Sequence, residues 1–166
     1  MEFELKEISH EGVEHSLERA THYRLLNEPA VAESICHDIL AIEPENEQAL
    51  ITLILALTDQ FGQASGIGLQ QVLDWLPKLH IEYDQHYYTG IVYERATKAR
   101  LNREYPGAKF DAYELLHAAM EFFEKAEAIH EVGNDDSILR WNACARLITA
   151  NNLRERPRDE APVMLE

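Results

Sequence analysis

A proline and an asparagine stand close together in the segment LAIEPENEQAL, residues 40–50, between two stretches with helical periodicity. Pro44 has no amide hydrogen to donate and disfavours the helical conformation at Glu43, so the first helix must end there. Asn46 is a favoured N-cap, because its side-chain oxygen accepts a hydrogen bond from the free amides of a new helix. The segment therefore predicts a helical hairpin with two nearly antiparallel helices.

Helical periodicity continues over almost the whole chain, without a convincing strand. The glycine-rich stretch 62–68 and the sequence YPGAKFD at 105–111 interrupt it, and KLHIEYD at 78–84 is typical of an extended connector. The chain is thus predicted to be all-α, with about seven helices. Their expected residues are 10–27, 29–42, 46–61, 69–76, 84–104, 110–132 and 137–153.

The charge of the chain disfavours one class of function, nucleic-acid binding. The 166 residues carry a net charge of −15, which repels phosphate backbones and disfavours nucleic-acid binding. There is no apolar run long enough to cross a membrane and no signal peptide at the start, so we expect a cytoplasmic protein with no membrane partner. Cys36 and Cys144 lie in apolar helical patterns and are predicted to be buried free thiols. We expect one domain, 1–153, followed by a flexible charged tail, 154–166.

Small and large residues recur at fixed spacings along the predicted helices. Ala20 is followed three residues later by Tyr23, and twelve residues after Ala20 comes Ala32 with Cys36 four residues on. Pro44 lies twelve residues after Ala32. Further pairs with a similar spacing are Gly90 with Tyr93, Ala119 with Phe123, and Trp141 with Cys144 and Ala145.

This pattern resembles the tetratricopeptide repeat, a helical hairpin of about 34 residues. The resemblance covers roughly residues 13–153, with two departures. The fourth helix matches poorly, with Gly66, Leu73 and Lys78 at its key places, and 29 residues separate Gly90 from Ala119 where 12 separate Ala20 from Ala32. The resemblance implies a right-handed array of antiparallel helix pairs, an α-solenoid. The other interpretation is an irregular all-α domain.

The spacing has a simple physical reading: the small residue lets a neighbouring helix approach, and the large residue fills the gap beside it. Residues at gap-filling positions or on apolar stripes are therefore predicted to be mostly buried. They are Tyr23, Cys36, Leu57, Trp75, Tyr93, Phe123 and Trp141.

The resemblance also implies a concave groove lined by the first helix of each pair. It suggests a non-catalytic interaction module, an adaptor or chaperone-like scaffold that binds a peptide or helix of a protein partner and needs no cofactor. Leu17 and Thr21 stand where chaperone-binding members carry a Lys and an Asn, which argues against that subfunction. The groove residues implied by the register are Leu17, Thr21, Arg24, Ile51, Leu55, Thr58, Tyr87, Ile91, Arg95, Asn142, Arg146 and Thr149.

Several residues on this expected inner face are arginines, which could bind a charged group of a partner. An arginine can lay its stem on apolar neighbours and present a planar donor fork. We hypothesise that Arg95 and Arg146 hold an acidic or carboxylate group of a partner, with Tyr87 and Ile91 in apolar contact. The alternative is that each arginine pairs with a nearby Glu, such as Glu94 or Glu114, and binds nothing.

An alternative function is a small helical enzyme or metal-binding protein that uses the cluster near 80–86, namely His80, Asp84 and His86. The pairs Glu114–His117 and Glu127–His130 have a metal-ligand spacing but lie about 140° apart around one helix, so they cannot share an ion. Cys36 and His37 are adjacent and point to different faces. No catalytic residue and no metal ligand is therefore predicted.

Overall fold

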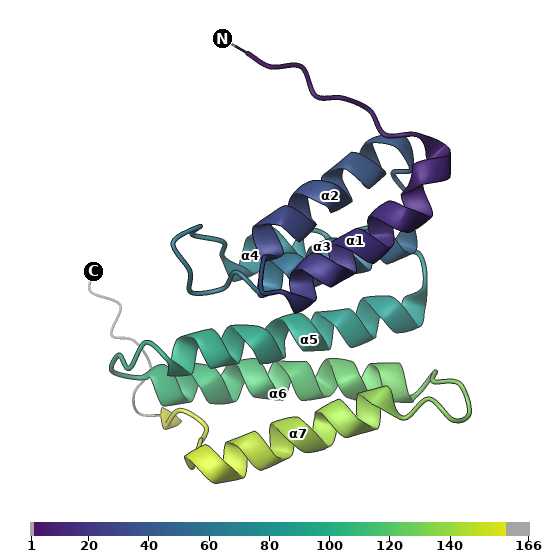
Figure 1. The fold of residues 1–166 in the computed structure, drawn as a ribbon. Helices are drawn as coiled ribbons and strands as arrows, with labels where there is room; N and C mark the ends of the chain where they lie inside the picture. The colour runs from purple at the N-terminus through teal and green to yellow at the C-terminus, as the bar shows by residue number, and fades with distance from the viewer. Residues whose placement is uncertain (1, 159–166) are drawn as a thin grey trace, which may run out of the picture.

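The computed structural model describes residues 2–158, and these residues form seven α-helices and no strand (Figure 1). The predicted all-α class is thereby confirmed. Two short 3-10 helices, His10–Gly12 and Leu76–Lys78, precede α1 and α5. The α-helices are α1 (Val13–Leu25), α2 (Pro29–Ile42), α3 (Glu47–Thr58), α4 (Leu69–Leu73), α5 (Glu82–Leu101), α6 (Ala108–Glu127) and α7 (Asp136–Asn151).

The hairpin between α2 and α3 has the predicted local chemistry. The helix α2 ends at Ile42, just before the Glu43–Pro44 pair, and Glu43 has left the helical conformation. The Asn46 side-chain oxygen accepts a hydrogen bond from the amide of Ala49 at 2.9 Å, and so caps α3. At this hairpin the sequence alone was sufficient, because capping depends on residues only three apart.

Several helices end sooner than predicted, and α3 and α4 each end three residues early, at Thr58 and Leu73. The helix α5 ends at Leu101 rather than near 104, because Glu104 has a φ of 47°, which no right-handed helix can contain. The helix α6 ends at Glu127 rather than near 132. At this end the backbone hydrogen bonds join residues three apart instead of four, as in the 3.1 Å hydrogen bond from the Ile129 amide to the Ala126 carbonyl.

The helices associate in sequence order. The helices α1, α2 and α3 contact one another, α3 contacts α5, and α5, α6 and α7 lie side by side in the other half of the molecule (Figure 1). Each half has its own cluster of buried apolar residues. Leu55 of α3 and Tyr88 of α5 pack against both clusters and join the two halves.

Several of the predicted small and large positions lie in the buried core. Ala20 and Ala32 are fully buried in α1 and α2, which contact each other, and Cys36 is buried with them. Phe123 is fully buried on α6. A Cβ atom added to Gly90 would lie only 2.5 Å from Cε1 of Phe123, so the absence of a side chain on α5 is what lets the ring approach.

The seven residues predicted to be mostly buried are buried or partly buried, and four of them are only partly buried. Tyr23, Trp75, Tyr93 and Trp141 each keep part of the ring at the surface. Large aromatic side chains commonly do so, because their polar atoms need partners. The Trp141 indole, for example, donates a hydrogen bond to Glu124 at 3.0 Å. Cys36, Leu57 and Phe123 are buried as predicted.

The close contact of Gly90 and Phe123 gives a testable prediction. Gly90→Ala should lower the free energy of unfolding by about 1–2 kcal/mol, because the strain of overpacking exceeds the gain in helix propensity. Chemical denaturation measures this change. In a Phe123→Ala background the ring is gone, and the same substitution should become neutral or stabilising. A loss of stability that is equal in both backgrounds would show that Gly90 does not make room for Phe123.

The first residues after α7 contact the body of the protein. Arg156 forms an ion pair with Asp111 of α6 at 2.7 Å, and its guanidinium lies 5.3 Å from the centre of the Phe110 ring. These contacts place the first part of the expected tail, 154–158, against α6. The rest of that tail, 159–166, lies outside the described residues.

Candidate partner-binding site

Two arginines from different helices meet on one carboxylate. The Arg24 guanidinium, near the end of α1, donates from Nε to Oδ2 of Asp59 at 2.7 Å and from Nη2 to Oδ1 at 3.3 Å. The Arg95 guanidinium on α5 donates from Nη1 to Oδ1 of Asp59 at 2.6 Å. Asp59 is the C-cap residue of α3, so this one side chain joins three helices.

Arg95 is held by more than the ion pair. Its Nη1 also donates to the Thr58 hydroxyl at 2.8 Å. Burial lowers the pKa of Arg95, Asp59 opposes this shift, and the neighbouring guanidiniums of Arg24 and Arg140 add to it. Two further guanidiniums therefore act on Arg95 besides the Asp59 carboxylate, and their charges would stabilise an additional negative group beside it.

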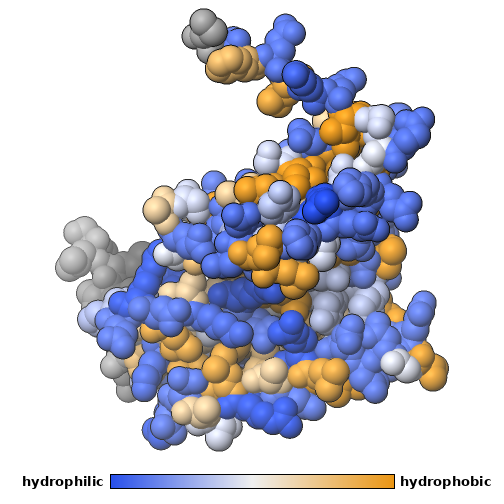
Figure 2. Space-filling model, in the orientation of Figure 1, coloured by the Kyte–Doolittle hydropathy of each residue, from blue (hydrophilic) through white to orange (hydrophobic). Residues whose placement is uncertain are grey.

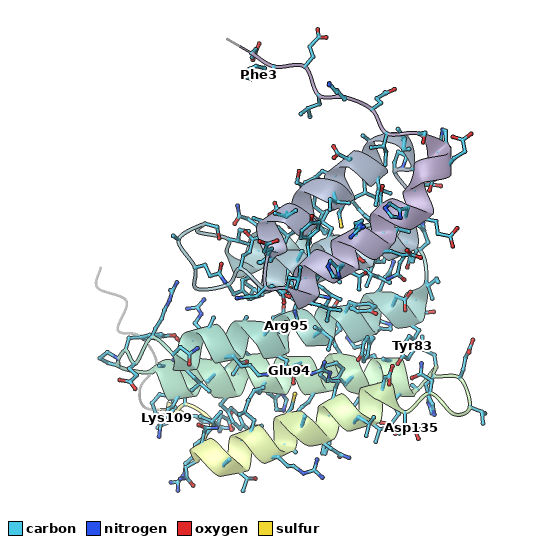
Figure 3. The ribbon with its side chains drawn as sticks, in the orientation of Figure 1. Phe3, Tyr83, Glu94, Arg95, Lys109 and Asp135 are labelled. Carbon is cyan, nitrogen blue, oxygen red and sulfur yellow. The ribbon has the colours of Figure 1, made fainter. Side chains whose placement is uncertain are left out.

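A second ion pair lies one residue away along α5. Glu94 is buried and accepts a hydrogen bond from Nη1 of Arg140 on α7 at 3.3 Å. Burial acts to lower the pKa of Arg140, but the Glu94 carboxylate and Tyr87 outweigh it, so the pKa is raised. Figure 3 shows Arg95 and Glu94 on different edges of α5. The pair of Arg95 with Asp59 ties α5 to the end of α3, and the pair of Glu94 with Arg140 ties it to α7.

Together these side chains leave an excess of positive charge. We call them the arginine cluster: Arg24, Asp59, Glu94, Arg95, Lys98 and Arg140. Lys98 is exposed one turn beyond Glu94, and its charge acts on Cys144 of α7. Four cations against two carboxylates give the cluster a net charge of +2, within a chain of net charge −15. Arg95 keeps 26% of its side chain exposed and Arg140 keeps 39%, so solvent reaches them.

The groove residues that the resemblance implied differ in how far they are exposed. Three of them, Ile51, Thr58 and Ile91, are buried between helices, so their side chains offer no surface to a partner. The others keep some exposure: Leu17, Thr21, Arg24, Leu55, Tyr87, Arg95, Asn142, Arg146 and Thr149. The helical register predicts which side of a helix a residue lies on. It does not predict how closely the next helix covers that side, so the burial of the twelve residues differs.

The residues predicted on α7 lie apart from the cluster. Arg146 is exposed, and it follows the fully buried Cys144 by two residues, which places it on roughly the opposite side of α7. Arg140 precedes Cys144 by one turn and reaches α5 instead. For Arg95 the structure shows the alternative arrangement, a pair with an acid of the chain itself, and that acid is Asp59 rather than Glu94 or Glu114.

On α1, two predicted residues line a shallow hollow. Leu17 and Thr21 line it together with Glu18, His22, Leu25 and Gln48, and its volume is about 450 Å³. Leu25 is highly exposed beside Arg24. The hollow lies along α1, the helix that also carries Arg24.

The residues of the alternative metal site do not come together. The Asp84 carboxyl faces Glu47 of α3, and burial first, then Glu47, raises its pKa. His86 lies against the Phe122 ring of α6. His80 is exposed, and it is its backbone amide that bonds to Glu47, at 2.9 Å. Residues 2–158 contain no group of three or more His, Cys, Asp or Glu side chains that could hold a metal ion.

Both cysteines are buried and free. Burial raises the pKa of Cys36 and of Cys144 to about 12. The thiolate is the nucleophilic form, so neither side chain is activated at neutral pH. His37, next to Cys36, turns outward to Glu33 at 3.8 Å, and the two residues form no nucleophilic pair.

Four residues of the cluster were missed by sequence reasoning. Asp59, Glu94, Lys98 and Arg140 were not among the predicted site residues, although Arg140 carried a usable signal, its spacing of four residues from Cys144. Asp59 offered no such signal, because its partners lie 35 and 36 residues away.

Comparisons of this chain with protein-family models, with curated proteins and with solved structures gave no match. Within residues 2–158, every helix is too short or too polar to cross a membrane.

Proposed function

We propose that the chain is a tetratricopeptide-like array in which α1, α3, α5 and α7 are the first helices of successive antiparallel pairs. The helix contacts support this assignment. Each proposed first helix touches the next, since α1 contacts α3, α3 contacts α5, and α5 contacts α7. The intervening helices α2 and α6 contact the first helices on either side of them. Stacked pairs of a helical array have these neighbours.

The function we propose is binding of a protein partner by the face that α1, α5 and α7 share. One observation carries the proposal: the arginine cluster gathers partly buried cations from these three helices in a strongly acidic chain. A structural ion pair needs one arginine for each acid, whereas Asp59 already has two. The surplus favours an additional carboxylate from outside.

The chemistry of the partner follows from the charges. The surrounding net charge of −15 disfavours a polyanion such as a nucleic acid, which needs a broad basic surface. A short segment with one or two acidic side chains and apolar neighbours fits better, because it meets the local excess charge together with Tyr87 and Leu25. In this proposal Arg140 takes the place that the sequence assigned to Arg146.

Charge reversal at the edge of the cluster tests the proposal. Lys98→Glu changes an exposed side chain that forms no ion pair within residues 2–158, so the fold should persist. Lys109→Glu is the matched control, an exposed lysine at the start of α6 (Figure 3). In affinity purification from the native host, Lys98→Glu should reduce partner recovery roughly five-fold at low salt, and Lys109→Glu should not.

Thermal melts of both variants establish that each is folded. Equal recovery of every co-purifying protein by the wild type and by folded Lys98→Glu would exclude the cluster as the binding surface. Equal losses for Lys98→Glu and Lys109→Glu would mean that overall charge, and not this surface, governs the association.

A further inference from the structure

An extended arm precedes the helices and leaves the body of the protein. Residues 2–9 have no helical or strand structure and run outward from the start of α1 (Figure 1). Ile8 packs against the apolar cluster of Val13 and Ile39 and anchors the base of the arm. Residues 2–7 are all exposed, and Phe3 lies near the tip of the arm (Figure 3).

The arm carries exposed apolar side chains as well as charged ones. Phe3 is 85% exposed and Leu5 is 91% exposed, and Figure 2 shows hydrophobic and hydrophilic residues intermingled along it. In an extended chain, residues two apart point to the same side, so Phe3 and Leu5 share one face. Glu2, Glu4 and Glu7 against Lys6 give residues 2–7 a net charge of −2.

The arginine cluster has the complementary properties. Its net charge of +2 matches the −2 of the arm, and Leu25 and Tyr87 beside it offer apolar and aromatic surface for Phe3 and Leu5. We propose that the arm of one copy of this chain docks on the arginine cluster of a second copy, in a reciprocal exchange that forms a dimer. This inference rests on the proposed function, because it names one occupant of the same surface.

The direction of the arm favours contact with the arginine cluster of a second copy over contact with the cluster of the same copy. The arm is anchored at the start of α1, whereas Arg24 lies near the other end of that helix, and the arm points away from it (Figure 1). Reciprocal exchange also makes two identical contacts at once, as twofold symmetry requires. The contact is short, and small interfaces below roughly 1,200 Å² are typical of weak complexes. We therefore expect a dissociation constant on the order of 100 µM.

Sedimentation equilibrium of the full chain, from about 10 µM to 1 mM, measures the dimer. The double variant Phe3→Ala, Leu5→Ala should weaken it by at least about 50-fold, because both apolar side chains lose their burial. Lys98→Glu should weaken the dimer roughly five-fold at low salt, and Lys109→Glu should leave it unchanged. Glu2→Lys together with Glu4→Lys in the otherwise wild-type chain should also weaken the dimer, because the arm then carries a charge of +2 and faces a cluster of the same sign.

Each contrary result overturns the inference. A wild type that stays monomeric at the highest concentration excludes the exchange, and a dimer that survives the double variant excludes the arm. If the arm variant is monomeric but Lys98→Glu behaves like Lys109→Glu, the arm docks elsewhere. The exposed side chains of Phe3 and Leu5 leave the monomer fold unchanged on truncation, which a thermal melt verifies.

The outcome is separable from that of the proposed function. If the wild type is monomeric while Lys98→Glu still loses its host partner, the exchange fails and the proposed function stands. If the dimer behaves as expected and Lys98→Glu retains every host partner, the surface binds its own arm and the proposed external partner is excluded.

Discussion

Phe123→Ala should lower the free energy of unfolding by about 3–5 kcal/mol. The ring is fully buried, it contacts Gly90, and its centre lies 5.9 Å from that of Tyr87. Truncation removes the transfer free energy of the ring and leaves a cavity that two rigid helices cannot close. Denaturant unfolding followed by circular dichroism measures the loss.

The adjacent residue provides the matched control. Phe122 occupies the same helix but is half-buried, stacked on Tyr93 with Lys125 over its ring. Phe122→Ala should cost only about 1–2 kcal/mol, because part of its surface is already in water. If the two variants unfold at the same denaturant concentration, the core does not depend on the side of α6 that faces Gly90.

Asp59→Ala should lower the free energy of unfolding by about 2–3 kcal/mol. The substitution leaves Arg24 and Arg95 facing each other without the carboxylate that both contact, and only 19% and 26% of these side chains are exposed. Removing one partner of a buried ion pair commonly costs about 3–5 kcal/mol, and partial exposure of this site reduces that figure. Denaturant unfolding at low salt measures the change.

Two comparisons make the Asp59 result specific. Asp74 is also a helix C-cap residue but is exposed, so Asp74→Ala should change stability by less than about 0.5 kcal/mol. Adding Arg95→Met to Asp59→Ala removes one of the two stranded charges and should recover part of the loss. Equal stability of the Asp59→Ala and Asp74→Ala variants would contradict the role of Asp59 in joining α1, α3 and α5.

The same substitution also bears on binding. Asp59 neutralises part of the arginine cluster, so its removal raises the local positive charge. If the variant stays folded, we expect its affinity for an acidic segment to rise while its stability falls. Opposite changes of this kind are typical of binding sites, where charges are arranged for a ligand and not for the fold alone.

The sequence by itself determined the local features of this protein. Pro29 begins α2 and Asn46 caps α3 as predicted, because these preferences depend on neighbours within one helical turn. The positions of Ala20, Cys36 and Phe123 in the core followed from helical periodicity. The all-α class followed from the same signal, repeated along the chain.

Only the tertiary structure decided which charges meet. Asp59 contacts Arg24 and Arg95 from 35 and 36 residues away, and Arg140 reaches Glu94 across 46 residues. These distances depend on how neighbouring helices cross and how deeply they pack, and a periodic pattern on one helix does not contain that information. Periodicity gives the face of a helix that turns inward; the depth of burial, and with it the surface left for a partner, is set by the helix packed against it.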